Sequence, residues 1–341
     1  GVGTAVPPDR YTQEQVLELF QVTDSRIRSL FVSGAIQGRH LCLPPPATDG
    51  TMAVETQGEL LHRHRTAGLE LGTQALTNCL KRAGHDLADI GYLCCVTSTG
   101  WLTPGFTALL SERLGLSRGC GRLDVVGMGC NAGLNGLNAV ATWTAAHPGE
   151  LAVLVCVEVC SAAYVFDGTM RTSVVNSLFG DGAAALAVVG GRLGQGPAVL
   201  RFASRLIPEA LSAMRYDWDD GSGKFSFYID RDVPYVVGAH AEAVVDELLA
   251  GTGVRRREVA HWIVHSGGKK VVDAVKVNLG LTAHDVRHTS TVLHDCGNLS
   301  SGSFLFSFER LLDEGAPAPG DYGVMMTMGP GSTIETALLQ W

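Results

Sequence analysis

The chain has 341 residues, of which 46% are hydrophobic and 18% charged, so it can bury a large core in one unit or two halves. Its formal net charge of −8, without a basic block, argues against general nucleic-acid binding. No apolar run reaches the roughly 18 residues of a spanning helix, so we expect no membrane association. Nine cysteines without a CxxC pair indicate reduced thiols and a cytoplasmic protein.

The first half of the chain alternates between expected strands and helices. Thr12 is a candidate cap for a helix that ends at Leu19, and a longer helix is expected at 59–83, where apolar residues recur with helical spacing. His62 and His64 lie on opposite sides of that helix, so we expect both at the surface and neither as a metal ligand. Further strands are expected at 90–100, 123–126, 151–157 and 183–189, with helices at 106–114 and 134–147.

The glycine-rich segment 190–196 does not join a strand to a helix, so it is expected to be a loop between two halves and not a dinucleotide motif. Beyond it the same alternation continues. Strands are expected at 225–229, 260–265, 322–328 and 334–339, and helices at 234–249, 271–279 and 304–312.

The segment 123–137 reads as a strand, a tight glycine turn and an apolar helix, with Cys130 at the start of the helix. The first turn of a helix has unpaired N–H groups and the positive end of the dipole. A thiol placed there ionises more easily and becomes a usable nucleophile. A small buried core cysteine is the alternative interpretation.

The two halves repeat the same pattern. Asn298 follows Cys130 by 168 residues, and both are expected at a glycine turn between a strand and an apolar helix. Gly115 and Gly280 each end a helix that follows a buried strand, and they are 165 residues apart. Nearly constant offsets indicate an internal duplication. We therefore expect an α/β fold of two similar halves, residues 1–190 and 197–341, with helices covering the sheets.

Cys130, Asn298 and His265, which ends a strand, then fall beyond the carboxyl ends of strands, where α/β sheets bind ligands. A cysteine beside an imidazole can form a thiolate–imidazolium pair. Asn298 can donate an N–H bond to an oxyanion or enolate, and His265 can add a second donor. This set suits acyl transfer and carbon–carbon bond formation through a thioester. A core histidine and a simple helix cap are the alternatives for His265 and Asn298.

Several motifs, in the right order, resemble the type III polyketide synthases, the chalcone synthase-like branch of the thiolase fold. The resemblance implies two duplicated halves in an α-β-α-β-α arrangement, with Cys130 in the first half and His265 and Asn298 in the second. The segments that carry the resemblance are 1–7, 129–130, 178–185, 232–234, 262–268, 297–301 and 329–331.

The resemblance implies that Cys130 carries the starter and the growing chain, while His265 and Asn298 promote malonyl decarboxylation and hold the enolate. Phe179 and Phe227 match two aromatic positions that gate the pocket. The arginines Arg26, Arg28 and Arg39 fit either a solvated face or a phosphate patch, and the family places Arg26 and Arg28 near the CoA phosphates. Further substrate-binding positions implied are Gly180, Gly267, Gly268, Pro330 and Gly331.

The family is homodimeric and uses no metal or redox cofactor, with CoA thioesters as substrates and CoA released. Segments 93–100 and 127–135 resemble a bacterial branch that builds a tetraketide from malonyl-CoA alone and closes it to a CoA-bound dihydroxyphenylacetyl product. That product feeds dihydroxyphenylglycine formation for glycopeptide antibiotics, where pathway partner proteins are possible. Asn131, where chalcone synthases have Phe, and Thr327-Met328, where they have Gly-Phe, put plant-type starters in doubt.

Three alternatives remain open on the residues. Another type III polyketide synthase would use a different starter or close a resorcinol or naphthalene ring. A cysteine acyl hydrolase would need a carboxylate that orients His265, and no Asp or Glu lies in these motifs. A non-catalytic scaffold would have no need to keep Cys130, His265 and Asn298 together.

Overall fold

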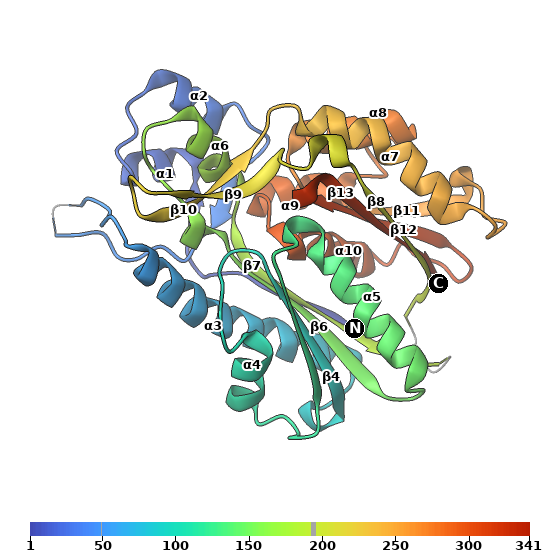
Figure 1. Ribbon diagram of the computed structural model, residues 1–341. Helices are drawn as coiled ribbons and strands as arrows, with labels where there is room; N and C mark the ends of the chain where they lie inside the picture. The colour runs from blue at the N-terminus through green and yellow to red at the C-terminus, as the bar shows by residue number, and fades with distance from the viewer. Residues whose placement is uncertain (49, 192–195) are drawn as a thin grey trace.

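The computed structural model describes residues 1–48, 50–191 and 196–341, which form five layers, α-β-α-β-α (Figure 1). The first sheet has five strands in the order β1-β7-β6-β4-β5. Its centre, β6, is buried along its whole length because helices cover both faces, which explains its unbroken apolar sequence. The strands are β1 (Val2–Ala5), β4 (Ile90–Thr97), β5 (Gly121–Val126), β6 (Leu151–Val159) and β7 (Asp181–Val189).

The second sheet has four strands in the order β11-β12-β13-β8. Its pairings repeat those of the first sheet: β8, β13 and β12 are antiparallel in turn, like β1, β7 and β6, and β11 is parallel to β12 as β4 is to β6. The repeated order agrees with the duplication expected from the offsets. The strands are β8 (Ala198–Leu206), β11 (Val259–Val264), β12 (Tyr322–Gly329) and β13 (Thr333–Gln340).

Two helices form the middle layer between the sheets. Helix α5 (Ala132–Ala146) contacts β4 and β6 on one side and β12 and β13 on the other, and α10 (Ser303–Glu314) contacts both sheets in the same way. Gly133 brings α5 against α10 and the turn before it: a Cβ there would lie 2.5 Å from Cε1 of Phe304 on α10 and still closer to the backbone carbonyl oxygen of Ser301 in that turn. Only glycine fits at position 133.

The outer layers are helical. Helix α3 (Gln57–Ala83) lies across the first sheet beside α4 (Phe106–Leu114), and α7 (Val233–Leu249) covers the second sheet beside α8 (Lys269–Leu279). Two small antiparallel strand pairs lie outside the sheets: β2 (Arg10–Thr12) with β3 (Gly38–His40), and the hairpin of β9 (Met214–Asp219) with β10 (Lys224–Ile229). The remaining helices are α1 (Gln13–Leu19), α2 (Ser25–Val32), α6 (Met170–Leu178) and α9 (Arg287–Cys296).

Most expected elements are present within a few residues of their predicted bounds, and Thr12 caps α1 through a reciprocal bond with Gln15. Two expectations were wrong. His64 is fully buried, because its face of α3 packs under Gly100, where a Cβ would overlap the imidazole. Asn298 follows helix α9 and not a strand, so the second half lacks a counterpart of β5. Of the expected inter-half loop, residues 192–195 lie outside the described residues.

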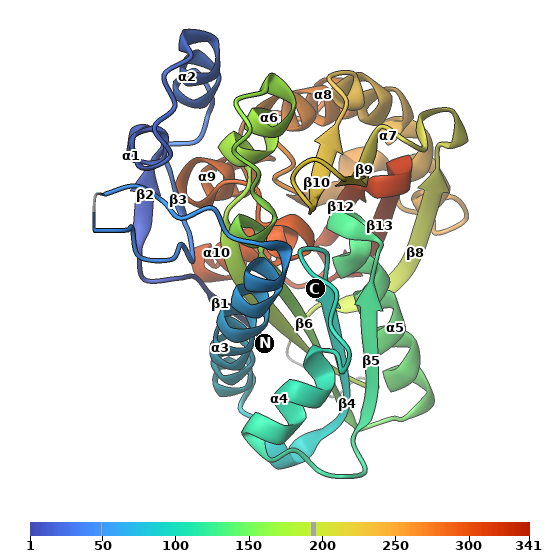
Figure 2. The same ribbon diagram turned by 60° about the vertical axis from the view of Figure 1, so that its left-hand side comes forward.

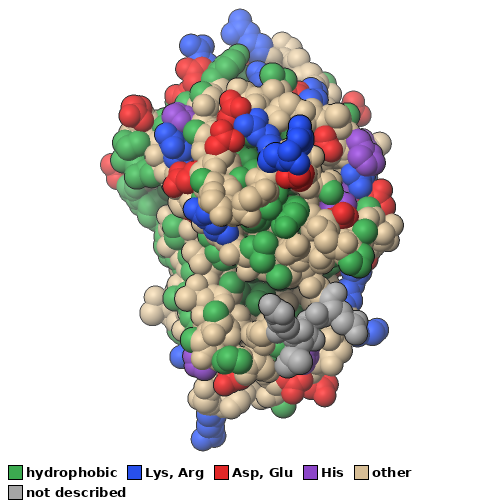
Figure 3. All heavy atoms as spheres, turned by 90° about the vertical axis from the view of Figure 1, so that its right-hand side faces the viewer, with side chains coloured by type: hydrophobic (Ala, Val, Ile, Leu, Met, Phe, Trp, Pro, Cys, Tyr) green, Lys and Arg blue, Asp and Glu red, His purple; other side chains and the backbone are tan. Residues whose placement is uncertain are grey.

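On the face drawn in Figure 3, Lys and Arg are interspersed with Asp and Glu, so this face has no large patch of one charge. Among the described residues, no helix combines the length and apolarity needed to cross a bilayer. All nine cysteines are free thiols, as expected from their spacing.

The contact between α5 and α10 predicts that Gly133→Ala destabilises the protein by about 1–3 kcal/mol, the usual cost of overpacking a core. Gly58→Ala is the matched control, because Gly58 also lies in a helix but its nearest neighbour beyond the helix backbone is 3.9 Å away. There we expect no loss and a small gain in stability. Thermal unfolding measures both, and equal melting temperatures for the two variants would contradict the close approach.

Candidate active site

Cys130 lies between β5 and α5, in a short 3-10 turn, η2 (Gly129–Asn131). Gly127 and Gly129 on either side of Met128 have φ of 88° and 75°, which glycine adopts at little cost. A Cβ on Gly129 would also overlap the ring of Pro330. The turn therefore brings Cys130 against the loop that follows β12.

A cavity of about 300 Å³ opens beside Cys130, which is 5% exposed and lines it. Its wall is mainly apolar and comes from both halves of the chain and from the β9–β10 hairpin. Such a cavity suits a small acyl chain better than a polar ligand. Apolar side chains that line it are Trp101, Val126, Phe179, Met214, Tyr216 and Phe227.

Ser300 connects Cys130 to Asn298. Its hydroxyl lies 3.4 Å from Cys130 Sγ, and its N–H donates to Asn298 Oδ1 at 2.8 Å. The residue has φ of 49°, in the left-handed region that non-glycine residues seldom adopt. Backbone strain of this kind persists where the surrounding structure fixes it, often at functional sites.

The Asn298 amide is oriented by this bond. A backbone N–H can only donate, so the side-chain atom facing Ser300 must be the oxygen. The Nδ2 group therefore points the other way, where it donates to no described residue although Asn298 is almost fully buried. It is available to a substrate oxygen.

His265, which follows the last residue of β11, is also buried and is held by one ring nitrogen. Its Nδ1 bonds to the Ser303 hydroxyl, while Nε2 makes no hydrogen bond within the described part of the chain. Gly267 keeps space on that side, because a Cβ there would lie 3.0 Å from Cδ2 and 3.3 Å from Nε2 of His265. No carboxylate orients the imidazole in the described residues, which removes the feature that a hydrolase would need.

Burial acts on both ionisable groups. It raises the pKa of the Cys130 thiol to about 12, against a smaller opposing effect of the Ser300 hydrogen bond, and it lowers the pKa of His265 to about 3. Each side chain taken alone is therefore neutral at pH 7. The bonds of this structure join Cys130 to Ser300 and His265 to Ser303, and no direct contact between the thiol and the imidazole is present in the described residues.

A buried polar chain behind Ser300 was missed from the sequence. The Ser98 hydroxyl lies 2.7 Å from that of Ser300 and 2.9 Å from Glu158 Oε1, and the Ser301 hydroxyl also donates to Glu158. Burial raises the pKa of Glu158. Only the clustering of three serines near Asn298 and one glutamate inside an apolar strand could have signalled this chain.

The predicted pocket residues separate into two groups. Phe179, Phe227 and Pro330 line the cavity, and the two phenylalanine rings meet edge to face with centroids 5.9 Å apart. Gly267 borders His265. The others do not line the cavity: a Cβ on Gly180 would overlap the Cys296 carbonyl, Gly268 lies against Leu178, and Gly331 forms a turn with φ of 76°.

The three arginines also separate. Arg26 is exposed and Arg28 half-buried on α2, outside the cavity lining, and Arg28 donates to the Val22 carbonyl at 3.0 Å. Arg39 is fully buried, so it is neither a solvated residue nor an accessible phosphate ligand. The position of Arg39 was wrongly anticipated because a long charged side chain is seldom buried without an ion pair.

The two departures from the chalcone synthase pattern contact each other. The Thr327 hydroxyl lies 3.4 Å from the Asn131 carbonyl oxygen that it faces, and both residues are buried. Neither lines the cavity. Asn131 and Thr327 therefore affect the cavity through the position of the turn that carries Cys130.

Two family models match the chain. The N-terminal domain of chalcone and stilbene synthases matches residues 1–192, and their C-terminal domain matches residues 201–341. The chain therefore belongs to the chalcone and stilbene synthase family, the type III polyketide synthases. It is an acyltransferase with the thiolase-like fold expected from its motifs.

The relatives are more specific. A 3,5-dihydroxyphenylacetyl-CoA synthase of Streptomyces toyocaensis is 63% identical over the whole of this chain and 89% of its own length. Another, of Amycolatopsis balhimycina, is 62% identical over the whole chain and 92% of its own length. The solved 1,3,6,8-tetrahydroxynaphthalene synthase of Streptomyces coelicolor A3(2) is 28% identical with a TM-score of 0.91, covering 100% of this chain and 98% of its own.

From the free Nε2 of His265 we predict that this ring nitrogen accepts the Cys130 proton, and His265→Gln tests this. Without the imidazole the thiol keeps the pKa that burial raises to about 12, so its thiolate fraction rises tenfold per pH unit between pH 7 and 10. We expect iodoacetamide to alkylate Cys130 more slowly in the variant at pH 7 and to recover toward high pH. Peptide mass spectrometry, with Cys130→Ala as the blank, follows the reaction. Superimposable pH profiles would contradict the assignment.

Proposed function

We propose that this enzyme condenses malonyl-CoA units on Cys130 to a tetraketide and closes it to 3,5-dihydroxyphenylacetyl-CoA. The identity of 61–63% to synthases of that product, over the whole chain, carries the substrate assignment. The geometry supports the chemistry: a buried thiol lines an apolar cavity, and the serine segment 300–303 that contacts the thiol also holds His265 and Asn298, each with one nitrogen unengaged. By the same likeness, the product would supply dihydroxyphenylglycine for antibiotic biosynthesis.

In the loading step, the Cys130 thiol gives its proton to His265 Nε2 and its sulfur attacks the thioester carbonyl. The bond to CoA breaks, and the CoA thiolate leaves and takes up a proton. The malonyl group on Cys130 loses CO2 and its carbanion takes up a proton from solvent, which leaves an acetyl starter. In the extension step, a second malonyl-CoA loses CO2, and the electron pair of the broken bond forms an enolate. Asn298 Nδ2 and protonated His265 Nε2 donate hydrogen bonds to its oxygen. The enolate carbon then attacks the Cys130 thioester and releases the sulfur.

Ring closure joins the terminal methyl carbon of the tetraketide to a ketone carbon of the same chain. Loss of one water and enolisation give the dihydroxyphenyl ring, and CoA remains on the product. Nothing in these steps is oxidised or reduced by an external reagent, so the chain's own groups and malonyl-CoA suffice. Arg26 and Arg28 are proposed to meet the CoA phosphates, and Phe179 and Phe227 to gate the cavity.

We also propose that the chain divides into a nucleophile half, residues 1–190, and an enolate half, residues 197–341. The matching strand orders of the two sheets support this division. It places Cys130 on one half and His265 and Asn298 on the other, with the cavity between them.

Mass spectrometry of the purified protein with malonyl-CoA alone tests the function. We expect an eight-carbon dihydroxyphenylacetyl product, as its CoA ester or free acid, without any added starter. Asn298→Ala should lose decarboxylation at least 100-fold while Cys130 still alkylates, since removing one such donor commonly costs 10²–10³ in rate. A wild-type enzyme that leaves malonyl-CoA untouched would refute the proposal.

We propose that the enzyme is a homodimer that pairs through the β5 edge. This strand ends the first sheet (Figure 2), so one side of its backbone has no strand partner within the described chain. Exposed apolar side chains continue the edge beside the cavity: Val126 is 39% exposed, Met128 38% and Trp101 42%. An apolar patch beside an unpaired edge is typical of a subunit interface.

Val126→Glu is expected to convert the dimer to a monomer, because a charge would be buried at the interface. Val277→Glu is the control, since Val277 on α8 is exposed but lies on the other half. Sedimentation equilibrium distinguishes the two. A wild-type protein that sediments as a monomer, or a Val126→Glu dimer as stable as the control, would refute the interface.

A further inference from the structure

Arg39 is a charged residue in the protein interior, where charged side chains are rare. It lies in β3, is 0% exposed, and packs between the rings of Phe31 and Tyr164, whose centroids are 5.9 and 5.8 Å from its Cζ. No carboxylate of the described residues lies within ion-pair distance of it. A buried charge without a counter-ion is costly unless its donors are satisfied.

The two terminal nitrogens of Arg39 donate mainly to the end of one helix, while its buried Nε has no hydrogen-bond partner among the described residues. Nη1 donates to the carbonyl oxygen of Phe179 at 2.8 Å and to that of Asn176, and Nη2 donates to Gln13 Oε1 at 2.7 Å. Gln13 in turn donates to the Ser177 carbonyl at 2.8 Å. The last carbonyls of a helix lack internal partners and lie at the negative end of its dipole. Arg39 therefore caps the C-terminus of α6 from inside the protein.

The capped segment carries a cavity side chain. Phe179 directly follows α6, and its ring lines the cavity beside Cys130. Tyr164 reinforces the same point, because its hydroxyl donates to the Phe179 carbonyl and accepts from Arg39 Nη1 at 2.6 Å. The backbone of Phe179 is thus held by two buried donors.

On its other side this segment is joined to the Asn298 turn. The Asn298 N–H donates to the Leu178 carbonyl at 2.9 Å, and the Gly180 N–H donates to the Asn298 carbonyl at 3.0 Å. The Arg39 stem also reaches this turn, since a Cβ on Gly297 would lie 3.0 Å from its Cγ and Cδ. One side chain from β3 therefore contacts both segments that face the thiol.

We propose that Arg39 is a positioning residue for decarboxylation, which sets the place of the Phe179 ring over the cavity and, through the bridge between the two backbones, that of Asn298. The proposal rests on the proposed function, because it assumes that malonyl-CoA is decarboxylated beside these residues. Lysine cannot replace Arg39, because one ammonium cannot span two carbonyls, a tyrosine and a glutamine.

A double-mutant cycle tests the proposal. Arg39→Lys is made in the wild type and in Phe179→Ala, and the decarboxylation of malonyl-CoA is measured per folded protein. In the wild type we expect kcat to fall about 10- to 100-fold, the effect of a small misplacement in an active site. Iodoacetamide labelling of Cys130 should change less than about twofold. In the Phe179→Ala background the further loss should be below a third of the first factor, because the ring that Arg39 places is gone and only the effect through the Asn298 turn remains.

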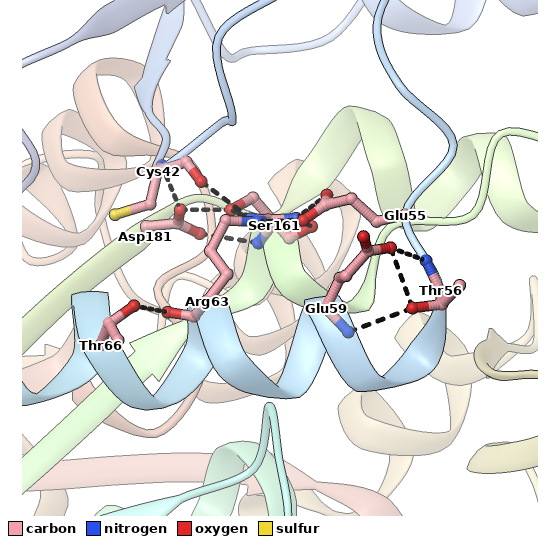
Figure 4. A network of polar contacts seen from close by, with 8 residues as sticks. All are labelled: Cys42, Glu55, Thr56, Glu59, Arg63, Thr66, Ser161 and Asp181. Atoms are coloured by element: carbon pink, nitrogen blue, oxygen red, sulfur yellow. Dashed lines mark hydrogen bonds and ion pairs between the residues drawn. The ribbon is translucent and has the colours of Figure 1, made fainter.

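Arg63→Lys is the matched control. Arg63 is also largely buried, donates to the Cys42 and Ser161 carbonyls at 2.8 and 3.2 Å, and pairs with Glu55 (Figure 4), but it contacts neither Phe179 nor Asn298. We expect a lower melting temperature with unchanged kcat. If Arg39→Lys does not fold, Tyr164→Phe replaces it in the cycle and should give the same pattern with a smaller loss.

The outcomes separate the two proposals. A wild-type protein that does not decarboxylate malonyl-CoA refutes the proposed function. If the wild type decarboxylates malonyl-CoA, two results overturn the positioning role alone. Either Arg39→Lys (or its substitute Tyr164→Phe) is as active as the wild type, or it lowers activity by equal factors in both backgrounds.

Discussion

The close approach of Gly133 on α5 to the turn before α10 is the constraint on which the site depends. Gly133 lets the start of α5 touch the backbone of that turn, so the segments that precede α5 and α10 lie together. Cys130 precedes α5, and Ser300 to Ser303 lead into α10, so the thiol, the amide and the imidazole share one short serine segment. A larger residue at position 133 would move these groups apart without changing the chemistry of any one of them.

Burial then determines the resting state of the chemistry. It favours the neutral thiol and the neutral imidazole to a similar extent, so neither carries a charge that the apolar wall would have to offset. Moving one proton between them creates a pair with no net charge. The free nitrogens of His265 and Asn298 are thereby left for a substrate oxygen, and the hydrogen bonds of Ser300 and Ser303 hold the opposite sides of the two groups.

Much of this could be predicted from the sequence, because strands such as 151–157 and caps such as Thr12 are local signals. Cys130 and His265 follow β5 and β11, as the strand patterns at 123–126 and 260–265 predicted. His64 and Arg39 were misplaced because their burial depends on Gly100 and on the end of α6, which are distant in sequence. The Glu158–Ser98 chain was missed because no periodicity encodes a contact between residues distant in sequence. Helix α9 was missed because the segment before Asn298 was interpreted as a strand.

The β9–β10 hairpin differs from the other elements of the cavity wall in its place in the fold. It belongs to neither sheet, yet it contributes Met214, Tyr216 and Phe227 to the lining. The thiol, the imidazole and the amide come from elements that also build the two cores. Selection can therefore alter the shape of the cavity through the hairpin while the two sheets and the reacting groups stay unchanged. In a family with this arrangement, the products can change while the reaction chemistry stays the same.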